Sequence, residues 1–171
     1  MQRRCIIMKV KNMCYGAVCA AVVFIVTRFI QIPIPLGYFN IGNCVIFLFC
    51  LVMPKKAGIF AGSAGSALAD LTSYPVYTLP TLLIKFLMPL LFYVLVAHWS
   101  HKKFSAVMAA AIAALIPLAG YTITGMIIYG SFYTGLAQLP GLLLEYAANL
   151  IIFALAYAPV RKAAHSLVKV S

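Results

Sequence analysis

The stretch FSAVMAAAIAALIPLAGYTITGMIIYGSFYTGLAQLPGLLL, residues 104–144, contains no charged side chain over 41 positions. About 20 apolar residues are enough for a helix to cross the ~30 Å hydrocarbon core of a bilayer, so this run is long enough for two crossings. Gly130, Gly135, Pro140 and Gly141 interrupt it and divide it into two segments. The stretch therefore predicts two membrane helices joined by a short connection.

The composition of the whole chain agrees with this interpretation. Of its 171 residues, 65% are apolar and 9% are charged, and the mean hydropathy is +1.06. A soluble domain carries roughly a quarter charged residues on its water-facing surface. We therefore predict an all-α integral membrane protein with a single domain over residues 1–171, and we exclude a large soluble catalytic domain.

Charges, prolines and glycines divide the chain into six predicted transmembrane helices, at about residues 12–32, 38–53, 57–75, 78–98, 104–129 and 137–160. The net charge of +11 arises from 13 Lys and Arg against two acids. Eleven of these bases precede the first span, follow the sixth, or join spans two to three and four to five, while the other connections carry none. Because basic loops remain in the cytoplasm, both termini are predicted to be cytoplasmic.

Four charged side chains fall within the predicted spans or at their ends: Arg28, Asp70, Lys85 and Glu145. A charge near the bilayer centre costs at least ~2.5–3.5 kcal/mol, so such residues usually face the bundle interior and line a substrate site. Lys85, Glu145 and Tyr121 are expected ~10–12 Å below the outer surface at 1.5 Å per residue, with Asn43 and Asp70 nearer that surface. Since the inner halves of the spans are almost wholly apolar, the sequence predicts a cup open to the outside.

The sixth predicted span adds two polar residues to this cup. Glu145 and Asn149 are four residues apart and so share one helix face, with Tyr146 beside them. Together with Lys85 and Tyr121 they offer charges, an amide and phenols, a mixture suited to a small polar ring compound. The alternative interpretation is a Lys85–Glu145 ion pair that only joins helices.

Two outer connections combine aromatic residues with proline. The first, residues 32–38, has prolines that stiffen an extended run and a glycine that can turn it. The second, residues 73–77, repeats the pattern. We expect Tyr38, Tyr74 and Tyr77 to close over the cup and stack on an aromatic ligand, although an interfacial aromatic belt would use tyrosines in the same way.

Ala17 and Ala21 form a pair of small residues on the first predicted span and allow another helix to approach closely. Packing inside the bundle is the alternative to a partner subunit. The five cysteines include no CxxC pair, and the three histidines lie at the predicted cytoplasmic edge. The sequence therefore predicts no metal site, no cofactor and no enzymatic activity.

Three ordered motifs resemble one family of membrane proteins. The run GYFNIGN at residues 37–43, the glycine-rich run from Gly58 to Leu71, and TLLIK at residues 81–85 resemble the substrate-binding S components of energy-coupling factor (ECF) vitamin transporters. The likeness is to the branch with riboflavin and hydroxymethylpyrimidine S components. Asn40 and Asn43, in the first motif, join the predicted substrate-binding residues. Asn43 stands where many members of that family carry Asp, and Met88-Pro89 replaces the Gly that usually follows the Ile-Lys segment in the family.

The resemblance implies a six-helix subunit in the plasma membrane of a prokaryote. It would capture a water-soluble vitamin or precursor from outside and dock on an ECF transmembrane coupling subunit driven by two cytoplasmic ATPase subunits. Ala17 and Ala21 match the alanine motif that meets the coupling subunit, and residues 32–38 match the lid. We favour a pyridine or pyrimidine substrate, such as a vitamin B6 form or hydroxymethylpyrimidine. Riboflavin is the alternative, with biotin and pantothenate as further candidates, and a solitary proton-coupled vitamin carrier is the competing class of protein.

Overall fold

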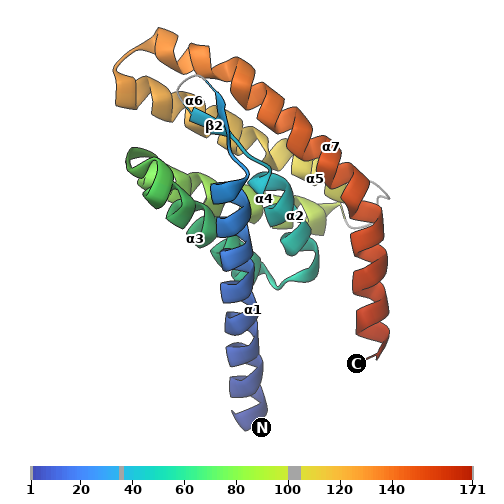
Figure 1. The fold of residues 1–171 in the computed structure, drawn as a ribbon. Coiled ribbons are helices and arrows are strands. Elements are labelled where there is room, and N and C mark those ends of the chain that lie inside the picture. The colour runs from blue at the N-terminus through green and yellow to red at the C-terminus, as the bar shows by residue number, and fades with distance from the viewer. Residues whose placement is uncertain (1, 35–36, 100–104, 171) are drawn as a thin grey trace.

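The computed structural model describes residues 2–34, 37–99 and 105–170, and side chains within residues 12–33, 38–99 and 105–162. In chain order the elements are α1 (Gln2–Phe29), β1 (Ile32–Ile34), β2 (Gly37–Phe39), α2 (Gly42–Val52), α3 (Lys55–Ser73), the 3-10 turn η1 (Pro75–Tyr77), α4 (Thr78–His98), α5 (Ser105–Ala113), α6 (Leu115–Tyr129) and α7 (Phe132–Val170). The protein is therefore an all-α bundle with one small hairpin (Figure 1).

The helices pack as two groups joined through α2 and α4. α3 packs on α1 and α4, while α7 packs on α6 and α2. An aromatic cluster joins three of these helices, with the ring of Phe47 centred 5.1 Å from Phe92 and 5.6 Å from Phe153. All three rings are almost completely buried. Figure 1 shows the start of α1 and the end of α7 at the same end of the molecule, opposite the hairpin.

The first outer connection forms an antiparallel hairpin between β1 and β2. Ile32 pairs with Phe39, Pro33 with Tyr38 and Ile34 with Gly37. The extended run expected from the two prolines is present, but it reaches further than predicted. Residues 38 and 39 belong to β2 and not to a helix, so α2 starts at Gly42 and not at residue 38.

Two other predicted breaks differ from the observed ones. The predicted span 104–129 is divided at Ala114, because Pro117 has no N–H to donate to the carbonyl of Ala113. In contrast, only Gly130 and Ser131 separate α6 from α7. Gly130 has a φ of +63° and ends α6 in the left-handed conformation. Pro140 lies inside α7, which begins at residue 132 and not at 137.

Among the described residues, four helical segments are long and apolar enough to cross a membrane: Asn12–Phe29, Pro75–His98, Ser105–Tyr129 and Phe132–Lys162. α2 has 11 residues and so extends ~16 Å, about half a hydrocarbon core. α3 has 19 residues but is rich in Gly, Ala and Ser. A multi-pass membrane protein is therefore supported, while the count of six crossings and the cytoplasmic termini remain predictions.

Small residues determine how α1 meets α3. A Cβ on Gly65 would lie 2.5 Å from the carbonyl oxygen of Ala20, and a Cβ on Gly16 would contact Ala57. The backbones of the two helices therefore touch at these positions. Ala17 and Ala21, each one residue further along α1, are exposed.

Candidate functional site

A cluster of buried polar side chains lies beneath the hairpin, where α2, α3, α4 and α7 meet. Its buried members come from four helices and from the connection after β2: Asn40, Asn43, Asp70, Thr81, Lys85, Glu145 and Asn149. Their surroundings are the apolar interior of a membrane bundle, in which an unsatisfied polar group is costly. Most of their polar atoms therefore form hydrogen bonds with one another.

Asn43 connects the two buried opposite charges. Its side-chain oxygen accepts a hydrogen bond from Lys85 Nζ, and its Nδ2 donates to Glu145 Oε1 over 3.1 Å. Asn40 Nδ2 lies 3.4 Å from the same oxygen. Lys85 Nζ also lies 5.5 Å from the centre of the Tyr121 ring, a cation–π distance. The ion pair considered from the sequence is thus bridged by an amide.

Asn43 contacts both charges that the sequence predicted at a deeper level. The sequence placed Asn43 nearer the outer surface, because it comes early in its predicted span, and its depth in a bilayer remains a prediction. The structure buries Asn43 to 3% exposure between Lys85 and Glu145. The cause is the hairpin, which uses up residues 32–39 and directs the first turn of α2 into the bundle.

Asp70 forms a second set of hydrogen bonds. Tyr38 of the hairpin donates to its Oδ1, and Thr81 of α4 donates to its Oδ2. The Thr81 hydroxyl also lies 3.1 Å from the Tyr121 hydroxyl. Burial, reinforced by the Asp70 carboxylate, raises the pKa of Tyr38, so its hydroxyl remains protonated and donates. The hairpin is thereby fastened to α3.

Asn149 holds the backbone that carries Asn40 and Asn43. Its Oδ1 accepts from the N–H of Cys44 over 2.8 Å, and its Nδ2 donates to the carbonyls of Asn40 and Glu145 over 2.8 and 2.9 Å. The described structure therefore gives Asn149 a positioning role. A direct ligand contact from Asn149 remains a prediction.

The predicted tyrosines lie at the edge of the cluster. The rings of Tyr38 and Tyr74 stack with centres 5.4 Å apart and planes at 26°. The ring of Tyr77 lies 6.4 Å from Tyr121, and its hydroxyl accepts a hydrogen bond from Gln138 over 3.2 Å. These contacts join the hairpin and η1 to the helices, and any stacking on a ligand remains a prediction.

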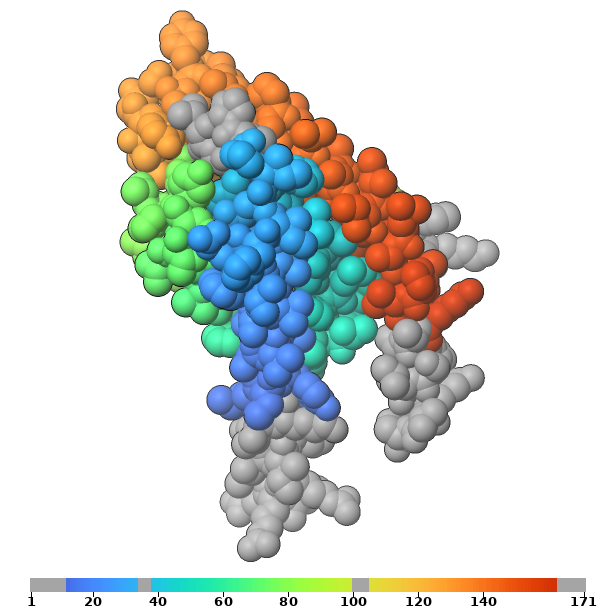
Figure 2. All heavy atoms as spheres, viewed as in Figure 1, coloured from blue at the N-terminus to red at the C-terminus, as the bar shows by residue number. Residues whose placement is uncertain are grey.

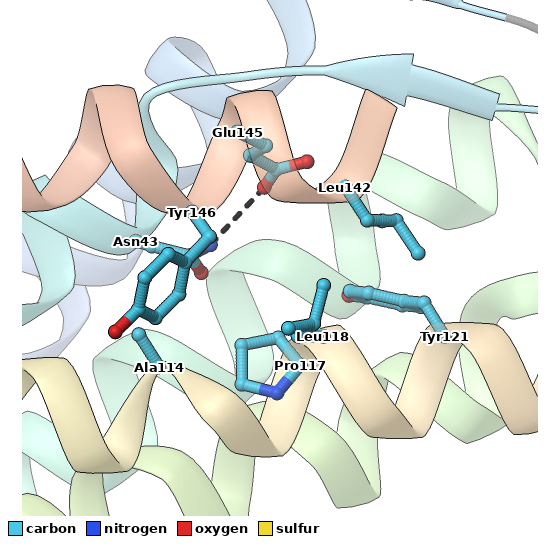
Figure 3. Close-up of a pocket in the computed structure, with 8 residues that line it drawn as sticks. All are labelled: Asn43, Ala114, Pro117, Leu118, Tyr121, Leu142, Glu145 and Tyr146. Carbon is cyan, nitrogen blue, oxygen red and sulfur yellow. Dashed lines mark hydrogen bonds between the residues drawn. The ribbon is translucent and has the colours of Figure 1, made fainter. Parts of the chain in front are cut away.

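A small cavity opens beside Glu145 between α6 and α7 (Figure 3). Its lining is mostly apolar and aromatic: Asn43, Ala114, Pro117, Leu118, Tyr121, Leu142, Glu145 and Tyr146. Its volume is about 10 Å³, room for roughly one water molecule. Pockets for organic ligands span ~300–1,000 Å³, so an organic ligand would have to displace some of these side chains.

Sequence reasoning did not select Thr81 of the cluster, nor the buried Gln138, which contacts Tyr77 at its edge. Thr81 lies four residues before Lys85, so helical periodicity places both on the face of α4 that reaches the cluster. That spacing was the available signal. The sequence contains no such signal for Gln138, because its partner Tyr77 is 61 residues away in the chain.

Ala17 and Ala21 lie far from this cluster in the fold, on the exposed face of α1. A groove of about 640 Å³ runs beside Ala17, between α1 and the start of α3. Its lining is mainly apolar and includes Met13, Pro54 and Phe60. Figure 2 shows the described part of α1 on the surface of the molecule. Contact with a partner subunit through Ala17 and Ala21 remains a prediction.

Three comparisons with known proteins bear on this site. The sequence model of the family described as ECF-type riboflavin transporter, S component, matches residues 7–162. A solved structure of the S component of a bacterial ECF transporter has a similar fold, with a TM-score of 0.72 and 20% identity, covering 93% of this chain and 98% of that one. An "Uncharacterized protein in gap 3'region" of Pyrococcus woesei is 45% identical over 65 residues, which are 37% of this chain and 44% of that protein. The match thus covers less than half of that curated relative.

Proposed function

Because the chain belongs to the family of ECF-type riboflavin transporter S components, we propose that it is the substrate-capture subunit of an ECF-type importer for a water-soluble vitamin or precursor. The observation that carries this proposal is the buried chain from Lys85 through Asn43 to Glu145. Such polar groups are costly inside a membrane bundle, so they indicate a binding function.

The substrate that we favour is a pyridine or pyrimidine, such as a vitamin B6 form or hydroxymethylpyrimidine. Lys85 and Glu145 would bind ring hydroxyls or nitrogens, Asn40 and Asn43 would add amide contacts, and the nearby tyrosines would stack on the ring. Riboflavin is the alternative, because the matching family is named for it. A tricyclic flavin would require this small cavity to open further than a single ring would.

Transport itself would require partners. An S component of this type would dock on an ECF transmembrane coupling subunit, which two cytoplasmic ATPase subunits drive, in the plasma membrane of a prokaryote. Exposure of Ala17 and Ala21 supports α1 as the docking helix. The competing class is a solitary proton-coupled carrier, for which the buried carboxyls Asp70 and Glu145 would serve as proton sites.

Two measurements test this function. Mass spectrometry of the detergent-purified chain is expected to identify a co-purified pyridine or pyrimidine. Recovery of riboflavin would make riboflavin the substrate in place of the single-ring vitamin. A non-vitamin ligand would contradict the proposed function. In proteoliposomes, vitamin uptake should require the coupling and ATPase subunits together with ATP. Uptake by this chain alone, driven by a proton gradient, would favour the solitary carrier.

A further inference from the structure

Glu145 lines the cavity, and one of its carboxylate oxygens has no hydrogen-bond donor among the described residues. Asn43 and Asn40 both approach Oε1, and no described residue donates to Oε2. The side chain is 5% exposed and lines the cavity. Figure 3 shows one carboxylate oxygen directed at Asn43 and the other directed away from it. Buried polar atoms nearly always have partners, so this oxygen is available to a ligand.

The other carboxyl of the cluster is already engaged, because both oxygens of Asp70 accept hydrogen bonds, from Tyr38 and Thr81. The ammonium group of Lys85 uses one of its three N–H donors on Asn43. The described cluster thus holds two carboxyls against one ammonium group, and its unengaged acceptor belongs to a carboxyl. A ligand that brings a positive charge would balance this set, whereas a neutral ligand would not.

The walls of the cavity suit a flat cation. Tyr121 and Tyr146 contribute rings, and Pro117, Leu118 and Leu142 contribute apolar surface. Tyrosine rings attract cations through their negative faces. In addition, a carboxylate oxygen forms its strongest hydrogen bonds with charged N–H donors. The same residues offer few donors to a ligand that presents only carbonyl oxygens at its edge.

Resting on the proposed function, we propose that the substrate is a flat nitrogen heterocycle that carries a positive charge and an N–H donor, and that this donor binds the unengaged oxygen of Glu145. The small cavity favours a single ring over a fused tricycle, since Leu118 and Leu142 must move less to admit a single ring. Glu145 thereby selects the charge of the ligand.

A matched pair of probes tests the charge. The full chain in detergent is titrated calorimetrically at pH 7.5 with pyridoxamine against pyridoxine, which differ by an ammonium in place of a hydroxyl. Riboflavin serves as a neutral tricycle. Pyridoxamine should bind about tenfold or more tightly than pyridoxine, the lower range for a charged hydrogen bond.

Two variants test the contact. Glu145→Gln keeps an oxygen for Asn40 and Asn43 but presents an amide to the cavity, so it should weaken binding of the charged probe about ten- to hundredfold and remove the preference. Asp70→Asn is the matched control, because it removes a buried carboxylate whose oxygens are both engaged; it should weaken the charged probe less. If Glu145→Gln does not fold, Glu145→Asp should retain the preference for charge.

The possible outcomes distinguish a failure of the charge assignment from a failure of the proposed vitamin-capture function. Tighter binding of a neutral probe, or equal losses in Glu145→Gln and Asp70→Asn, would overturn the charge assignment and leave vitamin capture standing. If no probe binds, native mass spectrometry of the purified chain decides: a co-purified cationic heterocycle supports the inference, and a neutral vitamin overturns it. A chain that binds no probe and carries no small molecule would overturn both.

Discussion

Replacement of Asn43 by leucine, which has a similar size, would remove the bridge between Lys85 and Glu145. Both hydrogen bonds that Asn43 forms with its neighbours' charged groups would be lost. Lys85 and Glu145 are 2% and 5% exposed, so water cannot readily replace the lost partner. We therefore expect Asn43→Leu to destabilise the protein in the absence of any ligand.

The size of the effect follows from these two bonds. Hydrogen bonds to charged groups contribute ~1.5–3 kcal/mol each, which gives about 3–6 kcal/mol for the pair. Better apolar packing of the leucine would offset part of this, leaving a net loss of roughly 2–4 kcal/mol. For a chain of this length, a loss of ~1 kcal/mol lowers the Tm by about 2–4 °C, so the expected decrease is about 4–16 °C.

Buried cysteines provide the assay. Cys19, Cys44 and Cys50 are buried, while Cys14 is exposed. A thiol-reactive fluorogenic dye added to the detergent-solubilised protein reacts at once with exposed thiols and reports unfolding as the buried ones become accessible. The midpoint of that second phase gives the Tm of the wild type and of each variant.

Asn12→Leu is the matched control, because it makes the same chemical change at an exposed position of α1. Exposed substitutions usually alter stability by less than ~0.5 kcal/mol, so its Tm should stay within about 2 °C of wild type. If Asn43→Leu shifted the Tm no more than Asn12→Leu does, Asn43 would not bridge the two charges, and the proposed site would lose its central contact.

Three further predictions concern the remainder of the fold. Ala17→Leu combined with Ala21→Leu should abolish uptake in the assembled transporter while vitamin binding by the isolated chain changes less than about twofold, since both residues lie on the exposed face of α1; parallel loss of both activities would indicate internal packing. Gly65→Val should destabilise the chain by more than ~2 kcal/mol in the dye assay, because its Cβ would lie 2.5 Å from the Ala20 carbonyl oxygen, and an unchanged Tm would contradict that close approach. Tyr38→Phe retains the ring but loses its hydroxyl bond to α3, so it should accelerate ligand release measured by stopped flow about tenfold; an unchanged release rate would show that this bond does not hold the hairpin closed.

Much of the candidate site could be anticipated from buried charge alone. Counting residues from the ends of the predicted spans placed Lys85, Tyr121 and Glu145 at one level. In the structure Lys85 lies over the Tyr121 ring, and the Asn43 side chain bridges Lys85 to Glu145. Counting predicts which residues share a level, because each residue of a straight helix adds a fixed rise. It did not predict that Asn43 would contact both charges, since the hairpin shifts the start of α2 to Gly42.

The sequence by itself determined the membrane environment, the helical class and the extended first connection of this protein. Apolar runs, the placement of lysines and arginines, and the residues Pro33, Pro35 and Gly37 act locally, so they can be interpreted without knowing which segments meet. Only the tertiary structure decided which polar groups meet. Asn149 holds the Asn40–Cys44 segment from 105 or more positions away, and one oxygen of Glu145 stays unengaged by the described residues because both asparagines approach the other. Such choices depend on how each helix is rotated against its neighbours, and that rotation is set by close contacts such as Gly65 against Ala20, which no local pattern specifies.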